Sequence, residues 1–104
     1  MGLKLIFMGT PEFAVPILKS LNESEHQIIS VYTQPPKKSK RGQKLNPSPV
    51  HQFSKKIKIN VRSPNLLTNQ EEIDYFKKLK ADVVVVVAYG KIIPSQLLDL
   101  KNLK

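Results

Sequence analysis

The sequence contains no cysteine. This absence excludes disulfide bonds and thiolate metal sites, and it fits a cytoplasmic protein. No apolar run approaches the roughly 20 residues that a membrane-spanning helix needs. The N-terminal residues also lack the small-residue cleavage pattern of a signal peptide. We therefore expect a cytoplasmic chain without a membrane segment and, at 104 residues, a single domain.

Acidic residues are missing from the central part of the chain. Between His26 and Gln70 there is no Asp or Glu but there are nine Lys or Arg, whereas the remaining eight basic residues are balanced by all eight acidic ones. Five of the nine cations fall within residues 37–44, "KKSKRGQK". Charge of one sign in one segment favours a polyanionic partner. A solvated lysine-rich surface is the alternative, and composition alone leaves it open.

Short apolar segments alternate with amphipathic ones along the chain. The pattern predicts strands at 3–9, 27–33, 59–62 and 82–90, with helices between them and after the last strand at 94–100. Such alternation implies a parallel sheet with right-handed crossovers. We therefore expect an α/β fold, the first half of a Rossmann-like doubly wound sheet, with the four strands in the order 3-2-1-4.

The sequence also predicts local features of the first helix and of the valine strand. In the first helix, Thr10 is predicted to be the N-cap, Pro16 to introduce a kink, and an apolar stripe to face the sheet. The stripe consists of Phe13, Ile17, Leu18 and Leu21. The five consecutive valines at 83–87 are typical of a central strand that is covered on both faces.

Ligands of doubly wound sheets bind beyond the carboxyl ends of the strands, where the strand order reverses. Here the tips at that point are residues 9–11 and 88–90. A dinucleotide is disfavoured because "GTPEF" has one glycine, a proline and an acidic residue where a pyrophosphate needs free amides. Tyr89, at the second tip, either covers the core or faces a ligand.

Neither a catalytic set nor a metal site is visible from residue spacing. The two histidines, His26 and His51, are isolated in the sequence. Glu71, Glu72 and Asp74 are typical charges of a helix start, and Asp82 begins a strand at the end opposite the crevice. The sequence therefore predicts a pocket wall and a surface for a polyanion, without metal ligands and without an obvious catalyst.

Four segments together resemble the N-terminal part of the methionyl-tRNA formyltransferase family. They are "FMGTPEFAVPIL", "TQPP", "RGQKLNPSPV" and "VVVVVAYGKIIP", and the resemblance extends over essentially all 104 residues. It implies transfer of a formyl group from 10-formyltetrahydrofolate to the methionyl amine of initiator tRNA, without a metal.

The same resemblance implies site residues. Those expected to bind tRNA are Lys37, Lys38, Lys40, Arg41, Gly42 and Lys44. Those expected to bind folate are Ala88, Tyr89, Gly90, Ile92 and Ile93. The methionyl end is expected near Gly9, Thr10, Pro11 and Phe13.

The chain also departs from the family pattern. Where the family usually has Asp-Arg-Pro-Ala-Gly, residues 36–40 read "PKKSK". The family's catalytic Asn, His and Asp fall beyond the position of Lys104. We therefore expect residues 1–104 to be the N-terminal portion of the formyltransferase domain, with no second domain, no catalytic residues and no activity alone.

Two alternatives stay open at this stage. The chain could be a non-catalytic RNA-binding remnant that acts through residues 37–44, or a fragment of a related sugar-nucleotide formyltransferase. Its valine strand would also have an unpaired edge in a half sheet, which favours self-association.

Overall fold

The computed structural model describes residues 2–38, 45–94 and 97. In chain order the elements are β1 (Lys4–Gly9), the 3₁₀ turn η1 (Glu12–Ala14), α1 (Val15–Asn22), β2 (Gln27–Tyr32), β3 (Lys37–Lys38), β4 (Leu45–Asn46), α2 (Pro49–Lys56), β5 (Val61–Arg62), α3 (Gln70–Lys78) and β6 (Val83–Val87). The helix expected at 94–100 lies almost entirely outside the described residues.

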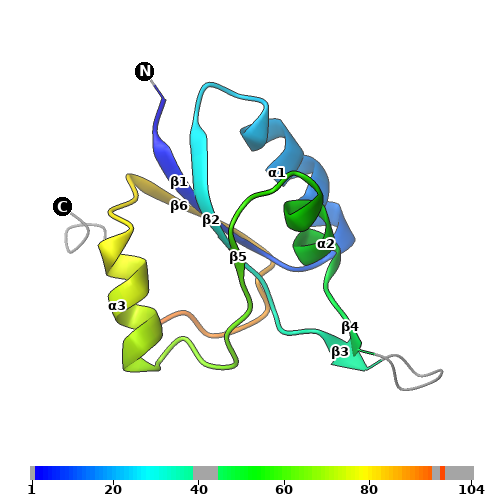
Figure 1. The fold of residues 1–104 in the computed structure, drawn as a ribbon, viewed down its shortest axis with the longest axis vertical. Helices are drawn as coiled ribbons and strands as arrows, with labels where there is room; N and C mark the ends of the chain where they lie inside the picture. The colour runs from blue at the N-terminus through cyan, green and yellow to red at the C-terminus, as the bar shows by residue number, and fades with distance from the viewer. Residues whose placement is uncertain (1, 39–44, 95–96, 98–104) are drawn as a thin grey trace.

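A four-stranded parallel sheet forms the centre of the fold, in the order β5-β2-β1-β6. In chain order these are the third, second, first and fourth of the predicted strands, so the expected topology and the α/β class are confirmed. Gly9 pairs with Val87 across β1 and β6, and Met8 pairs with Tyr32 across β1 and β2. The carboxyl ends of these three strands therefore lie side by side (Figure 1).

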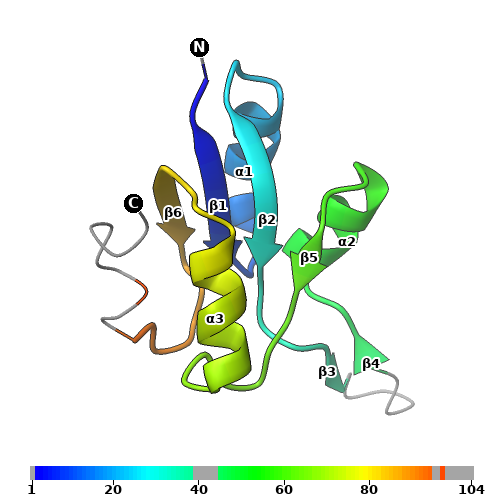
Figure 2. The same ribbon diagram turned by 60° about the vertical axis from the view of Figure 1, so that its left-hand side comes forward.

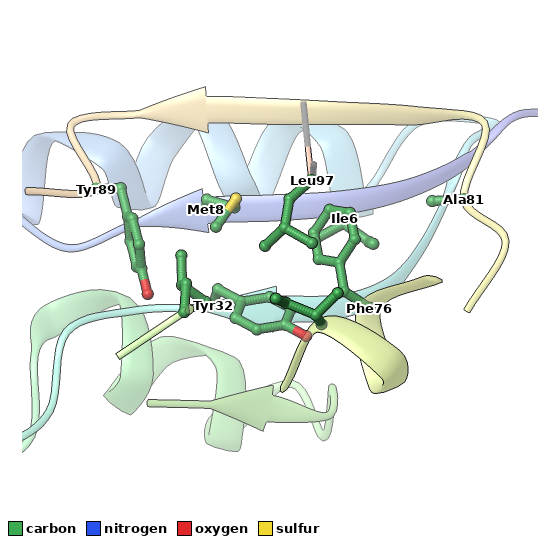
Figure 3. Packing of buried hydrophobic residues seen from close by; sticks show 9 residues of the cluster. Ile6, Met8, Tyr32, Phe76, Ala81, Tyr89 and Leu97 are labelled. Carbon is green, nitrogen blue, oxygen red and sulfur yellow. The ribbon is translucent and has the colours of Figure 1, made fainter. Parts of the chain in front are cut away.

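Helices cover both faces of the sheet (Figure 2). On one face, α1 and α2 pack over the cluster of Leu5, Phe7, Ala14, Leu18, Ile28, Val31 and Val50. On the other face, α3 contributes Ile73 and Phe76 to a second cluster, whose other members are Ile6, Met8, Tyr32, Leu67, Ala81, Tyr89 and Leu97 (Figure 3). Alternate residues of β1 enter opposite clusters, as the two-residue period of a strand requires.

The valine segment is a strand, as predicted, but it is not central in the described part of the chain. There β6 pairs only with β1, at the edge of the sheet. Its valines are therefore half-buried rather than fully covered, and Val86 is 45% exposed. Self-association through this edge stays a prediction.

The beginning of the first helix differs from the prediction. Thr10 is not the N-cap: the chain first forms η1, whose N-cap is Pro11, and α1 then begins at Val15 with Ala14 as its N-cap. Pro16 consequently lies in the first turn of α1, where a missing N–H costs no hydrogen bond, so it does not kink a helix interior. The 3₁₀ turn also shifts the helical phase.

This shift changes which side chains face the sheet. Ala14 and Leu18, four residues apart, are fully buried, whereas Phe13 is 64% and Ile17 41% exposed. The predicted inward positions of Phe13 and Ile17 are therefore wrong.

Candidate substrate pocket at the strand ends

The tips of three strands are joined by one group of hydrogen bonds. The Thr10 hydroxyl donates to the main-chain carbonyl of Tyr89 at 2.7 Å and accepts from the main-chain N–H of Gln34 at 3.3 Å. The side-chain amide of Gln34 donates to the same Tyr89 carbonyl at 3.1 Å. Thr10 follows β1, Gln34 follows β2, and Tyr89 follows β6. We call these three residues the strand-end junction.

The junction holds an unusual main-chain conformation after β6. Ala88 has a φ of 49° and Gly90 a φ of 86°, both in the left-handed region. Ala88 in that region is strained by about 1 kcal/mol relative to glycine. The paired hydrogen bonds to the Tyr89 carbonyl, between these two residues, keep the tip in this conformation.

Gly9 is required by close packing at the first tip. A Cβ atom there would lie 2.8 Å from the Val87 carbonyl oxygen and 2.9 Å from the Phe7 ring. Because one of these contacts is with backbone, a side chain at residue 9 would force β1 and β6 apart.

A cavity of about 280 Å³ opens beside the junction, beyond the ends of β1 and β2. It is lined by Thr10, Pro11, Gln34, Pro35, Lys37, Asn46, Pro47, Ser48 and Pro49. The prolines give it rigid apolar walls, and the hydroxyl and amide groups offer a few polar contacts. Such a cavity accommodates a small apolar group that has a polar end.

Ser48 fixes the wall that α2 contributes. Its hydroxyl caps the helix by accepting from the N–H of His51 at 3.0 Å, and it also shares a hydrogen bond with the buried Thr33 hydroxyl. Pro49 then occupies the first helical position, where no N–H is needed. No histidine or carboxylate is among the lining residues, so this wall supplies no general base.

A second cavity of about 270 Å³ lies under the segment that follows β6. It is lined by Asn65, Leu66, Leu67, Thr68, Lys91 and Ile92. Ile92 is 90% exposed, and the Lys91 ammonium donates to the Asn65 carbonyl at 2.9 Å. In the described part of the chain, no main-chain hydrogen bond outside helices and strands involves residues 90–93. Their amides and carbonyls could therefore pair with a flat heterocycle.

The side chain and the main-chain carbonyl of Tyr89 have different surroundings. Its side chain is buried in the cluster under α3, and its hydroxyl has no partner among the described residues (Figure 3). Burial, with a smaller contribution from the Glu72 charge, raises the pKa of Tyr89 to about 12. The side chain therefore covers the core, whereas the carbonyl belongs to the strand-end junction.

The structure brings some of the predicted site residues together and separates others. Thr10, Pro11 and Lys37 line one cavity, next to Gly9, whereas Phe13 is exposed and does not line it. Ala88 and Gly90 are exposed at the second tip, Ile92 lines the second cavity, and Ile93 packs at the edge of the core. Lys38 forms β3, but its side chain is outside the description, as are Lys40, Arg41, Gly42 and Lys44 entirely.

Sequence reasoning missed Gln34, Asn46 and Ser48 as lining residues. Gln34 had a usable signal, because it follows the second strand directly and lies at the same sheet edge as Thr10. Asn46 and Ser48 had none, since their position depends on the return of the chain from β3 through β4.

Two findings concern other kinds of site. Within residues 2–38, 45–94 and 97, no group of three or more His, Asp or Glu side chains could hold a metal ion. No helix in the described part of the chain is long and apolar enough to cross a membrane.

Comparison with known proteins assigns the chain to a family. The sequence pattern of the formyl transferase family matches residues 3–104. The chain is similar to "Methionyl-tRNA formyltransferase" of Pelagibacter ubique, with 57% identity over 98 residues, which are 93% of this chain and 32% of that protein. The protein of the same name from Paramagnetospirillum magneticum is 50% identical over 101 residues, covering 97% of this chain and 33% of that protein.

A third relative of that name, from Rickettsia bellii, is 46% identical over 100 residues, covering 96% of this chain and 33% of that protein. The chain thus spans about a third of the length of the curated relatives it matches. The family pattern covers nearly every residue, including both tips and the cavity lining. The chain belongs to the formyl transferase family.

Proposed function

We propose that the chain is the N-terminal, substrate-binding part of the catalytic domain of a cytoplasmic methionyl-tRNA formyltransferase. The whole enzyme would transfer the formyl group of 10-formyltetrahydrofolate to the α-amino group of methionine on initiator tRNA. The observation that carries the proposal is the strand-end junction. It fixes the cavity at Thr10 and the segment after β6 at the same edge of the sheet, where two reacting substrates must meet.

The cavity beside Thr10 is the proposed site of the methionyl end. Its proline walls suit an unbranched thioether side chain, and Gln34 and Asn46 offer polar contacts to the amino-acid ester. Gly9 supports this wall by letting β1 and β6 approach closely. Phe13, which the family resemblance also implied, has no contact with this cavity among the described residues and would contribute only from the exposed surface.

The proposed contact with tRNA begins at the rim of the same cavity. Lys37 is exposed there, and residues 38, 40, 41, 42 and 44 continue the cationic segment. Lysine and arginine neutralise phosphates and release counterions, which gives affinity that depends strongly on salt. A cationic rim beside the methionyl pocket suits a substrate whose reactive end is attached to RNA.

The segment at residues 88–93 is the proposed contact for the folate donor. Its main-chain groups from Gly90 to Ile93 suit the donor and acceptor edge of a pterin, and the exposed Ile92 offers an apolar surface to the ring. The Tyr89 carbonyl is already saturated by Thr10 and Gln34, so it would orient the segment rather than bind the donor directly.

Chemistry at this site needs groups that the lining residues do not supply. As the amine attacks the formyl carbon, a C–N bond to methionine forms and the bond to the folate nitrogen breaks, with a proton passing from the amine. Such a step requires donors at the developing oxyanion and a base near the amine. In the family resemblance an Asn, a His and an Asp have these roles, beyond the position of Lys104.

To test the proposal, fluorescence anisotropy measures the binding of initiator methionyl-tRNA to the 104-residue chain over a range of salt concentrations. With about three to five phosphates neutralised, log K should fall with log [salt] with a slope of about −2 to −4. Replacing Lys37, Lys38, Lys40, Arg41 and Lys44 with Ala should flatten that line. Replacing the four lysines with Arg, which keeps the charge, is the matched control and should leave the slope unchanged.

A second measurement concerns catalysis. The chain alone, supplied with 10-formyltetrahydrofolate and methionyl-tRNA, should form no formylmethionyl-tRNA. Turnover would overturn the inference that the base and the oxyanion donors come from elsewhere. Unchanged RNA binding after the five alanine substitutions would overturn the role of residues 37–44.

A further inference from the structure

Three Lys-Lys-x-Lys tetrads occur in the chain, at residues 37–40, 55–58 and 77–80. The first lies in the segment already proposed to contact tRNA. The other two have the same local structure, because each closes a helix. Lys55 and Lys56 stand in the last turn of α2, and Lys77 and Lys78 in the last turn of α3.

The last lysine of each helical tetrad adopts the left-handed conformation that usually ends a helix with glycine. The φ angles are 60° at Lys58 and 52° at Lys80. The two tetrads are therefore matched in charge, spacing and backbone, but they lie on opposite faces of the sheet (Figure 2).

Their electrostatic surroundings differ. Helix α3 carries Glu71, Glu72 and Asp74 together with its lysines, so its charges nearly cancel. Helix α2 carries no acidic residue at all, and neither does any other position from 27 to 69. The α2 tetrad is thus a concentration of positive charge, whereas the α3 tetrad belongs to a mixed surface.

Acidic residues also occur on the elements packed against α2. These elements are η1, α1 and β5. They contribute Glu12 on η1 and Glu23 at the end of α1, while β5 contributes the cation Arg62. Among the described residues, the ion pair is between Arg62 and Glu72, and none involves an α2 lysine. Lys55, Lys56 and Lys58 are all exposed to solvent.

The position of α2 connects its tetrad to the proposed substrate pocket. Ser48 lines the cavity and caps α2, and the helix then leads away from the β3–β4 hairpin (Figure 1). From Ser48 to Lys56 the helix rises about 12 Å, a distance over which a nucleic-acid strand presents about three phosphates. His51, one turn before Lys55, has its pKa lowered by burial and by the Lys55 charge, so it is neutral at pH 7 and adds no cation.

We propose that Lys55, Lys56 and Lys58 form a second contact with the RNA backbone, in addition to the one proposed for the cationic segment at residues 37–44. This inference rests on the proposed function, in which RNA is the partner. The contact would neutralise phosphates without reading bases, and it would hold the duplex part of the RNA while the hairpin contacts the end that enters the pocket.

The test compares three triple variants of the 104-residue chain, each with three lysines replaced by Gln. The variants change residues 37, 38 and 40, residues 55, 56 and 58, and residues 77, 78 and 80. All three have the same net charge, and the two helical variants lose the same interaction with the helix dipole. Anisotropy of initiator methionyl-tRNA is measured against salt, with circular dichroism to confirm that each variant is folded.

We expect the α2 variant to reduce the salt slope by about 3, as three lost contacts to duplex phosphates would, and the α3 variant to change it by less than half as much. An α2 variant that binds like the α3 variant overturns the second contact. If the hairpin variant still binds weakly in that case, the proposed function stands without this extension. Equal behaviour of all three variants would instead overturn any local contact, including the one at residues 37–44.

A charge-retaining variant addresses the role of the ammonium groups. Replacing Lys55, Lys56 and Lys58 with Arg should restore the slope, because phosphates are neutralised by either cation. Failure of Arg to restore it, with the fold intact, would also count against a backbone contact.

Discussion

The Thr10 hydroxyl donates a 2.7 Å hydrogen bond to the carbonyl of Tyr89, 79 residues later in the chain. One side chain after the first strand thereby fixes the tip after the last. Since Gln34 joins the same carbonyl, the ends of β1, β2 and β6 are positioned together beside the proposed substrate pocket.

Replacing Thr10 with Val should destabilise the fold by about 1–2 kcal/mol, because the shape is kept while the Tyr89 carbonyl loses a donor. Chemical denaturation measures this loss. Amide hydrogen exchange should also become faster at residues 88–91, where the junction restrains the tip. The exposed Thr68 is a matched control, and its replacement with Val should change stability by less than about 0.5 kcal/mol. Equal effects at both positions would contradict a special role for the junction.

Gly9→Ala should destabilise the fold by about 1–3 kcal/mol, as overpacking in a well-packed core commonly does. The added methyl group would meet the Val87 carbonyl oxygen at 2.8 Å. Thermal unfolding followed by circular dichroism measures the change. A variant as stable as the parent chain would show that β1 and β6 separate without cost.

Lys58→Gly and Lys80→Gly should each stabilise the chain by about 0.5–1 kcal/mol, because glycine adopts a positive φ without strain. Lys56→Gly is the control within the helix, and there glycine should cost about 1 kcal/mol. Because the expected changes in stability have opposite signs, the denaturant midpoints of the variants are enough to distinguish them. Destabilisation at Lys58 or Lys80 would mean that the lysine side chain contributes more than the strain costs.

Tyr89→Phe should stabilise the chain by about 1 kcal/mol near pH 7, because the buried hydroxyl has no partner among the described residues. The substitution should also change the alkaline limb of stability. The pKa of Tyr89 is raised to about 12 in the fold, mainly by burial. Above pH 10 the unfolded chain ionises this group first, so stability falls as the pH rises from 10 to about 12.

The Phe variant lacks this group, so it should lose less stability than the parent chain over that pH range. Denaturation at pH 7, 10 and 11 compares the two. Tyr32, whose pKa is also raised by burial, continues to titrate in both chains and accounts for the remaining slope. A variant less stable than the parent at pH 7 would show that the Tyr89 hydroxyl has a partner.

His51→Gln should reduce the pH dependence of stability on the acidic side. Burial and the Lys55 charge lower the pKa of His51 below its ordinary value of 6.5. Protonation of His51 therefore favours the unfolded chain. The stability that depends on the neutral imidazole is fully present above pH 6.5 and is lost as the pH falls below that value. Denaturation at pH 5 and 7 should show a smaller difference for the variant. An unchanged difference would assign the acid sensitivity to other groups.

Sequence reasoning reached the sheet order because β-α-β alternation and right-handed crossovers leave few arrangements. It failed at the first helix, where η1 shifts the phase and leaves Phe13 exposed while burying Ala14. A 3₁₀ turn of three residues has no hydrophobic period to recognise.

The candidate site was predictable only where it follows strand ends. Thr10, Pro11 and the tip at 88–90 come directly from the sheet order. The role of Gln34 depends on a side-chain amide that reaches the Tyr89 carbonyl. The position of Asn46 depends on its pairing with Lys37 across the β3–β4 hairpin. Such long-range contacts leave no periodic trace in the sequence.

We expect the outer edge of β6 to influence how this chain behaves in solution. Beyond Val83–Val87 the described part of the molecule offers a row of strand amides and carbonyls, flanked by valine methyl groups, with no neighbouring strand. An unpaired strand edge of this kind can form hydrogen bonds with a strand of another chain. If two chains pair through this edge, the melting temperature should rise with protein concentration.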